Sequence, residues 1–194
     1  MEKLTRDFYD RDTITVARDL LGKHLVRVLN GETLVCRITE TEAYIGRCDK
    51  ACHAYGYKRT NRTETLFARP GTAYIYLIYG MYNCLNFVTE PEGEPAAVLI
   101  RGLEAVSGIG TMTRLRYPKN PSQLTAYQQK NFLNGPGKLC KALSLDRSLN
   151  GLDLTGDTLY VVSSGETPET IHTGPRIGID YAEEAVDFPW RFWI

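Results

Sequence analysis

Two carboxylates two residues apart are best placed in this sequence for acid–base chemistry. Glu40 and Glu42 lie in the run from Leu34 to Tyr44, which begins with apolar residues and is expected to form a strand. Side chains alternate along a strand, so both carboxylates share one face, roughly 6.6 to 7 Å apart along the backbone. Close like charges raise the pKa of at least one of them, which suits a general acid or base. The structural alternative is a carboxylate that pairs with an arginine such as Arg37 or Arg101.

Two other polar residues interrupt runs that are otherwise apolar. Arg101 lies in the expected strand of residues 96–103, where a guanidinium must pair with a carboxylate or bind a substrate, and Glu42 is the natural partner. Asn86 lies in an apolar run, and a buried amide needs partners in the fold or in a ligand. Cys48, Cys52 and His53 cluster in the sequence, but no fourth ligand has recognisable spacing, so no metal is expected.

A hairpin rich in aromatic residues is the next predicted element. Two β-prone runs, residues 74–78 and 82–88, meet at Gly80, which tolerates a positive φ. Hairpin tips normally carry small polar residues, whereas this one offers Tyr79, Met81 and Tyr82 to solvent. Either another part of the protein covers these side chains, or they form a wedge that enters a base stack and opens a duplex.

The other patterns predict one compact α+β domain over residues 1–194, with a mostly antiparallel curved sheet, surrounding helices and the protruding hairpin. A helix is expected from Asp10 to Leu21, with Asp10 or Asp12 as its cap, and another at residues 104–115. A third helix begins near Pro136. The remaining expectations are strands at residues 23–29, 32–44 and 159–162, a basic loop at 46–68, a strand or extended segment at 176–180 and a packed aromatic C-terminus at 189–194.

Composition limits the classes of partner. Lys plus Arg and Asp plus Glu both number 23, so the formal net charge is zero. A large electrostatic grip on nucleic acid is not expected from this total, although a neutral chain can carry a basic face. The N-terminus has no apolar signal region and no run approaches the length of a membrane span, so a cytoplasmic location is expected. Five scattered cysteines indicate reduced thiols.

The order of the motifs resembles the alkyladenine DNA glycosylase family, the mammalian-type 3-methyladenine DNA glycosylases. The resemblance runs from about residue 5 to the C-terminus and rests on residues 40–44, His53, residues 74–86, residues 99–101 and residues 135–139. It implies a monofunctional N-glycosyl hydrolase without metal or other cofactor. Such an enzyme flips an alkylated or deaminated purine out of duplex DNA and hydrolyses its N-glycosidic bond, leaving an abasic site. The substrates it implies are 3-methyladenine, 7-methylguanine, hypoxanthine and ethenoadenine. It also implies a monomer, associated with the nucleoid if the source is bacterial.

The same resemblance implies a role for each matching residue. Glu42 deprotonates the attacking water, which the Arg101 side chain and the backbone carbonyl of Ile177 help to hold. The flipped base lies between Tyr44 on one side and Tyr76 with His53 on the other, and Asn86 crowds the 2-amino group of guanine. The residues implied in DNA binding are the intercalating Tyr79, with Met81 and Tyr82 beside it in the minor groove, and Arg59, Arg62 and Lys138 on phosphates.

Two other classes of protein fit parts of the pattern. A non-catalytic protein that binds damaged DNA would keep the wedge and lose the chemistry, but it has no need of a buried pair such as Glu42 and Arg101. A carbohydrate hydrolase would use Glu40 and Glu42 as acid and base, but two carboxylates on one face of a strand lie on the same side of a sugar.

Overall fold

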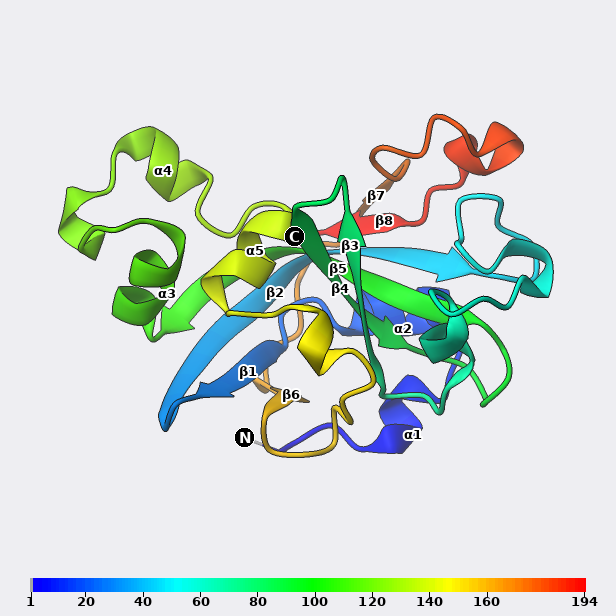
Figure 1. Ribbon diagram of the computed structural model, residues 1–194, viewed down its shortest axis with the longest axis horizontal. Coiled ribbons are helices and arrows are strands. Elements are labelled where there is room, and N and C mark those ends of the chain that lie inside the picture. Colours follow the sequence, from blue (N-terminus) through cyan, green and yellow to red (C-terminus); the bar gives the residue numbers. More distant parts are fainter. Residues whose placement is uncertain (1) are drawn as a thin grey trace.

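The computed structural model describes residues 2–194, which form one compact α+β domain around an eight-stranded, mostly antiparallel sheet (Figure 1). The strand order is β3-β4-β5-β2-β1-β6, and β8 pairs with both β2 and β7. The strands are β1 (His24–Leu29), β2 (Glu32–Ile45), β3 (Ala73–Ile78), β4 (Tyr82–Val88), β5 (Ala96–Ser107), β6 (Leu159–Val162), β7 (His172–Gly174) and β8 (Arg191–Trp193). The helices are α1 (Arg6–Tyr9), α2 (Thr13–Asp19), α3 (Ile109–Arg116), α4 (Ala126–Lys130) and α5 (Pro136–Ala142), with short 3-10 turns between elements. The predicted fold class is confirmed.

The long central strands β2 and β5 position the polar groups of the sheet. Their register shifts between Ile38 and Glu40 and again between Glu40 and Thr41, as at a β-bulge. A bulge bends the strand and re-aims its side chains. Gly102 lies opposite the bulge, where an added Cβ would come 2.9 Å from the Cβ of Glu40. This close approach brings Glu40 and Glu42 towards Arg101 on the neighbouring strand.

The main core lies between the sheet and the helices α2, α3 and α5. It is built from fully buried side chains that include Val16, Leu20, Phe87, Met112 and Leu139. The first predicted helix, Asp10 to Leu21, is confirmed in part as the shorter α2, and the separate helix α1 precedes it. Asp12 caps α2, since its carboxylate accepts a hydrogen bond of 2.8 Å from the backbone N–H of Thr15.

The predicted helix at residues 104–115 is wrong over its first turn. Strand β5 continues to Ser107 because residues 104–107 pair with residues 35–37 of β2. The helix α3 starts only after Gly108, which has a φ of 81°. A Cβ at Gly108 would lie 2.4 Å from Leu34 Cδ2, so the chain needs a glycine there to turn over the sheet.

Residues 176–180, expected to be a strand or an extended segment, do not form a strand. The strand is β7, which ends at Gly174, and the chain then forms turns that lead to a 3-10 turn η5 (Glu183–Asp187). Arg176 is buried at the start of this segment and ties it to the domain through hydrogen bonds. The aromatic C-terminus packs as predicted, with β8 paired along β2 and Phe192 in the core.

The predicted hairpin is confirmed, with β3 and β4 paired in register from Ala73–Phe87 to Ile78–Tyr82. Its tip projects beyond the sheet, and Figure 1 shows α4 on one side of the tip and the segment around η5 on the other. All five cysteines are free, as predicted. Among residues 2–194, no helix is long and apolar enough to cross a membrane.

Candidate active site

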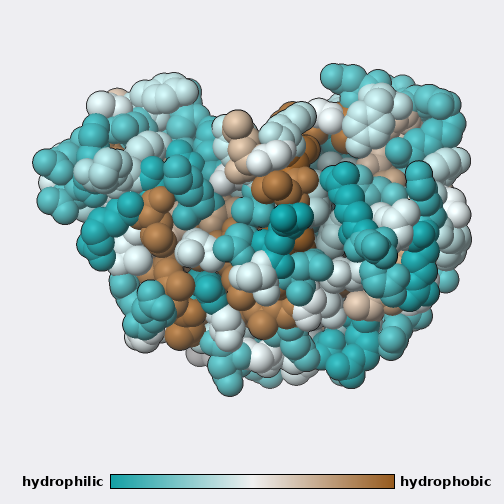
Figure 2. Space-filling view, in the orientation of Figure 1, coloured by the Kyte–Doolittle hydropathy of each residue, from teal (hydrophilic) through white to brown (hydrophobic). Residues whose placement is uncertain are grey.

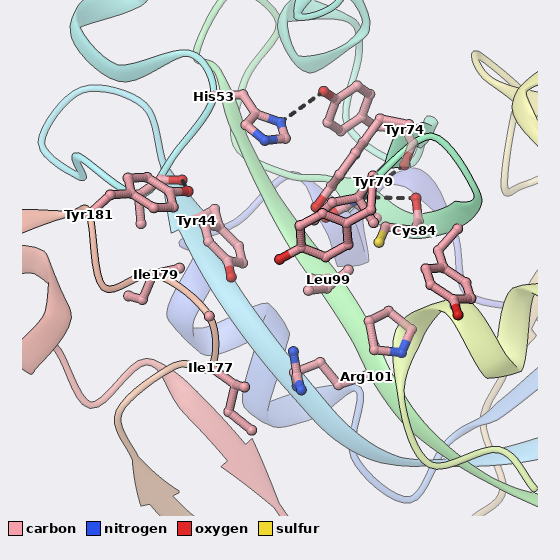
Figure 3. A pocket seen from close by; sticks show the side chains of 18 residues that line it. Tyr44, His53, Tyr74, Tyr79, Cys84, Leu99, Arg101, Ile177, Ile179 and Tyr181 are labelled. Atoms are coloured by element: carbon pink, nitrogen blue, oxygen red, sulfur yellow. Dashed lines mark hydrogen bonds between the residues drawn. The ribbon is translucent and has the colours of Figure 1, made fainter. Parts of the chain in front are cut away.

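A cavity of about 560 Å³ opens beside the hairpin, within the usual size of a small-molecule pocket. Figure 3 shows aromatic side chains around it, from β2, from the hairpin and from the C-terminal segment. Its lining comes from residues far apart in sequence, namely Tyr44, Ala51, His53, Tyr74, Tyr76, Ile78, Tyr79, Tyr82, Cys84, Asn86, Leu99, Arg101, Pro136, Gly137, Ile177, Gly178, Ile179 and Tyr181. Eight of the predicted site residues are in this lining, and five are not, namely Glu42, Met81, Arg59, Arg62 and Lys138.

Glu42 lies fully buried behind the cavity lining, held by three donors. Its Oε1 accepts a hydrogen bond of 2.8 Å from the backbone N–H of Ile177 and lies 3.4 Å from Arg101 Nε. Its Oε2 accepts a hydrogen bond of 2.7 Å from the Tyr44 hydroxyl. A carboxylate oxygen can accept two hydrogen bonds, so Oε2 has capacity for one more donor.

Burial raises the pKa of Glu42, while Arg101, the Tyr44 hydroxyl and the Ile177 N–H act in the opposite direction. A raised pKa with the carboxylate still hydrogen-bonded is the arrangement expected of a general base. Glu40 differs, because Arg101 and Arg191 both contact its Oε1, at 3.2 and 3.3 Å. Of the two carboxylates, Glu40 therefore has the structural ion pairs and Glu42 the enclosed position beside the cavity.

Aromatic rings form two walls of the cavity. The Tyr44 ring lies on the β2 side, and the rings of Tyr74 and Tyr76 lie on the hairpin side, 5.3 Å apart (Figure 3). His53 completes the second wall with its ring 4.6 Å from that of Tyr76 in an edge contact. Burial, followed by the charge of Glu42, keeps the pKa of Tyr44 well above its usual value, so this hydroxyl stays protonated and donates.

His53 is held neutral in a single tautomer. Burial and the nearby charge of Arg62 lower its pKa to about 4. Its Nδ1 lies 3.1 Å from the Tyr74 hydroxyl and its Nε2 lies 3.4 Å from an Arg62 nitrogen. Arginine can only donate, so Nε2 accepts and the proton resides on Nδ1. The histidine thus presents an uncharged ring to the cavity at neutral pH.

Asn86 lies at the floor of the cavity, on β4. Its amide nitrogen donates to the backbone carbonyls of Tyr74, at 3.1 Å, and Cys84, at 3.3 Å. Both bonds fix the orientation of the side chain across the hairpin. The amide is therefore satisfied mainly by the fold, and it lines the cavity in one fixed orientation.

The hairpin tip exposes bulky side chains, as the sequence predicted. Tyr79 is 80% exposed and Met81 is 66% exposed. Tyr79 has a φ of 51° and Gly80 a φ of 69°, the left-handed pair of a tight hairpin turn in which Asn-Gly is the usual sequence. A tyrosine at this position carries backbone strain, which points to a role for its side chain. Tyr82, half-exposed, packs on Gly137 of α5, where a Cβ would come 2.8 Å from its ring.

The predicted phosphate-contacting residues lie in different settings. Arg62 is exposed at the rim, with its guanidinium 5.3 Å from the Tyr76 ring. Lys138 donates to Asn131 at 2.8 Å. Arg59 forms a pair of hydrogen bonds with Glu64 and lies outside the cavity. Within residues 2–194, no group of three or more His, Cys, Asp and Glu side chains is arranged to hold a metal ion.

Sequence reasoning missed a buried ion pair that supports the site. Arg176 and Asp49 are completely buried and share two hydrogen bonds of 2.5 and 2.8 Å. The Arg176 guanidinium also donates to the backbone carbonyl of Ala43 and lies 4.7 Å from the centre of the Tyr44 ring. These contacts anchor the backbone next to Ile177 to β2 and to the Tyr44 ring, which forms a wall of the cavity. Only the isolated arginine between Pro175 and Ile177 hinted at this pair in the sequence.

Comparison with known proteins decides the family. The family model for methylpurine-DNA glycosylase matches residues 7–194, nearly the whole chain. The chain belongs to the methylpurine-DNA glycosylase family. This confirms the resemblance found in the sequence, and it confirms an enzyme of the DNA glycosylase class, which acts in base excision repair.

Bacterial proteins are similar in sequence to this methylpurine-DNA glycosylase family member over nearly their whole length. A protein of Clostridium perfringens strain SM101 is 57% identical over 195 residues, which cover 99% of this chain and 95% of the relative. A protein of Alkaliphilus oremlandii is 54% identical over 192 residues, with the same coverages of 99% and 95%. A protein of Bacillus cytotoxicus is 50% identical over 194 residues, covering 96% and 93%. Each bears the name "Putative 3-methyladenine DNA glycosylase".

Proposed function

We propose that this glycosylase removes alkylated and deaminated purines from duplex DNA, with Glu42 as the base that activates water. The observation that carries the proposal is the fully buried Glu42, which has a raised pKa and contacts Arg101, Tyr44 and Ile177 of the cavity lining. The damaged nucleotide would leave the duplex and enter the cavity, and the product would be a free base and an abasic site. The substrates we propose are 3-methyladenine, 7-methylguanine, hypoxanthine and ethenoadenine.

The chemical step requires one proton acceptor. The oxygen of water attacks C1′ of the sugar as the N-glycosidic bond breaks, and the bonding electron pair leaves with the purine. Glu42 Oε2 takes the proton, because this oxygen has a hydrogen bond only from Tyr44 and can accept another. Arg101 keeps the carboxylate charged and, with the backbone of Ile177, orients the water.

The cavity favours a damaged base over a normal one in two ways. A purine nucleotide methylated at N3 or N7 is cationic, so the faces of Tyr44 and Tyr76 attract the base through cation–π contact. The neutral His53 adds a third aromatic contact without repelling that charge. Asn86, held rigidly by two backbone carbonyls, would crowd the 2-amino group of an unmodified guanine.

Tyr79 would fill the space left in the base stack, with Met81 and Tyr82 beside it in the minor groove. Arg62 and Lys138 would contact phosphates near the flipped nucleotide, and Arg59 would do so only after leaving Glu64. Every residue in this scheme comes from one chain, so we propose that the enzyme works as a monomer.

The direct test is alkali-revealed strand cleavage of labelled duplexes that carry one hypoxanthine or one ethenoadenine, and of methylated DNA. We expect cleavage at the lesion and none in the undamaged duplex. Binding to these lesions without cleavage of any of the three would contradict the proposal.

A further inference from the structure

The charges of this electrically neutral chain are strongly segregated. The segment from Ala105 to Leu145 contains no Asp or Glu, and its basic residues are Arg114, Arg116, Lys119, Lys130, Lys138 and Lys141. These residues belong to α3, α4, α5 and the connections between them. The rest of the chain must carry an equal negative charge, since the total is zero.

Three basic side chains of this lobe, residues 109–133, face solvent, and one of them, Arg114, also donates a hydrogen bond to the Thr111 hydroxyl. Arg114, Lys119 and Lys130 are exposed. Among the described residues, none of the three forms an ion pair. Tyr127, which lies between the two lysines in the sequence, is 76% exposed. Exposed cations without ion pairs, interspersed with an exposed aromatic residue, are typical of a nucleic-acid surface.

The lobe lies next to the hairpin on the open side of the cavity. It connects directly to α5, whose Pro136 and Gly137 line the cavity and whose Gly137 packs on Tyr82. In Figure 1, α4 rises to about the height of the hairpin tip. Figure 2 shows the surface hollowed between this lobe and the opposite shoulder, with the hairpin tip in the hollow.

The opposite shoulder carries the other sign of charge. Asp180, Glu183, Glu184 and Asp187 are all exposed in and beside η5. Lys50 pairs with two of them, and Arg176 is buried with Asp49. Two carboxylates, Asp180 and Asp187, therefore face solvent on this shoulder without a partner among the ion pairs of the described residues.

We propose that the lobe of residues 109–133 binds the phosphate backbone of the substrate duplex on one side of the lesion, and that the acidic shoulder leaves the other side weakly held. The inference rests on the proposed function for the position of the duplex across the hairpin. When basic side chains neutralise phosphates, counterions are released and the affinity for DNA rises. The lobe can therefore bind DNA locally although the net charge of the chain is zero. The enzyme then needs more duplex on one side of the damaged base than on the other.

The first test neutralises the lobe with the triple change Arg114→Gln, Lys119→Gln and Lys130→Gln. The control is Lys23→Gln, Arg69→Gln and Arg147→Gln, three cations outside residues 105–145 that form no ion pair among the described residues. Binding to a hypoxanthine duplex is measured as salt rises. Each lost phosphate contact lowers the slope of log K against log salt by about 0.9, so we expect the lobe variant to lose roughly 2 to 3 units of slope. A slope equal to that of the control overturns the proposal.

The second test moves the lesion within the duplex. One substrate has four base pairs on the 5′ side of the hypoxanthine and twelve on the 3′ side, and its mirror has the reverse. We expect the wild type to bind one of them at least tenfold more weakly, and the lobe variant to bind both alike. Equal binding of the two by the wild type overturns the proposal.

Failure of this inference and failure of the proposed function can be told apart. The lobe variant keeps Glu42, Arg101 and the cavity, so at saturating enzyme it should release the base at the wild-type rate. No base release by the wild type would refute the proposed function, whereas an unchanged salt slope with normal base release would refute only the role of the lobe.

Discussion

At the scale of single residues, the site depends on how burial sets the charge of Glu42. The carboxylate is enclosed, its pKa is raised, and three donors oppose the rise without cancelling it. The group must be ionised to accept a proton. Activity should therefore be lost as the pH falls through this raised pKa, above the value of about 4.3 that is usual for glutamate.

The Tyr44 hydroxyl allows this dependence to be tested. Its hydrogen bond lowers the pKa of Glu42, so Tyr44→Phe should move the acidic limb of the pH–rate profile upward while the ring continues to form the wall. At pH 6 we expect a single-turnover rate lower by about tenfold, in line with the loss of one hydrogen bond to a charged group. A variant profile that overlays the wild type would mean that Glu42 does not titrate in the reaction.

His53 connects the pH to the stability of the fold. Its pKa falls from 6.5 to about 4 on folding, so the folded state binds fewer protons between these values. The corresponding stability is present above pH 6.5 and is lost as the pH falls towards 4, to a limit of about 3 kcal/mol. Urea unfolding of His53→Asn should show a weaker fall in stability over this range than the wild type. Parallel curves would place the histidine in a solvated setting.

At the scale of elements, the exposed Tyr79 at the hairpin tip lowers the stability of the turn, because its backbone is left-handed. Tyr79 has a left-handed backbone, which asparagine adopts more easily. We expect Tyr79→Asn to raise the free energy of unfolding by up to about 1 kcal/mol and to weaken binding to a lesion-containing duplex. Tyr79→Phe is the control, since it keeps the ring and should retain binding. A loss of stability in Tyr79→Asn would show that the side chain supports the turn.

The ion pair between Arg176 and Asp49 fixes the C-terminal segment to the loop that follows β2. Removing one partner leaves the other charge buried and unpaired, so Asp49→Ala should cost about 3 to 5 kcal/mol in urea unfolding. Arg59→Ala, which breaks an exposed pair with Glu64, should change the stability little. Equal effects of the two substitutions would mean that the Arg176 pair is well solvated.

At the scale of the whole molecule, local sequence patterns predicted the strands and turns whose formation depends on residues close in sequence. Period two placed Glu42 on a strand, and the glycine placed Tyr79 at the hairpin tip, whereas the choice of Glu42 and Tyr76 as site residues came from the family resemblance. Asp49 and Arg176 could not be paired from the sequence, because the loop and the C-terminal segment meet only in the folded chain. Residues 104–107 have a helical pattern but pair with β2, so the sheet overrides their local preference.

The charges are also distributed unevenly over the whole molecule. The net charge is zero, but a basic lobe lies on one side of the hairpin and an acidic shoulder on the other. The zero net charge predicted modest affinity for nucleic acid. The clustering of basic residues in the lobe explains how this part of the surface can still bind DNA. The salt dependence of DNA binding by such a protein should weaken when the basic residues of the lobe are neutralised.

The central claim is that Glu42, and not its neighbour Glu40, is the base. The most direct measurement is single-turnover release of hypoxanthine from a labelled duplex by Glu42→Gln and Glu40→Gln, with binding to the same duplex measured in parallel. We predict that Glu42→Gln binds the lesion but releases no base, while Glu40→Gln, which loosens Arg101 and Arg191, retains a reduced rate. Base release by Glu42→Gln at the wild-type rate would contradict the account.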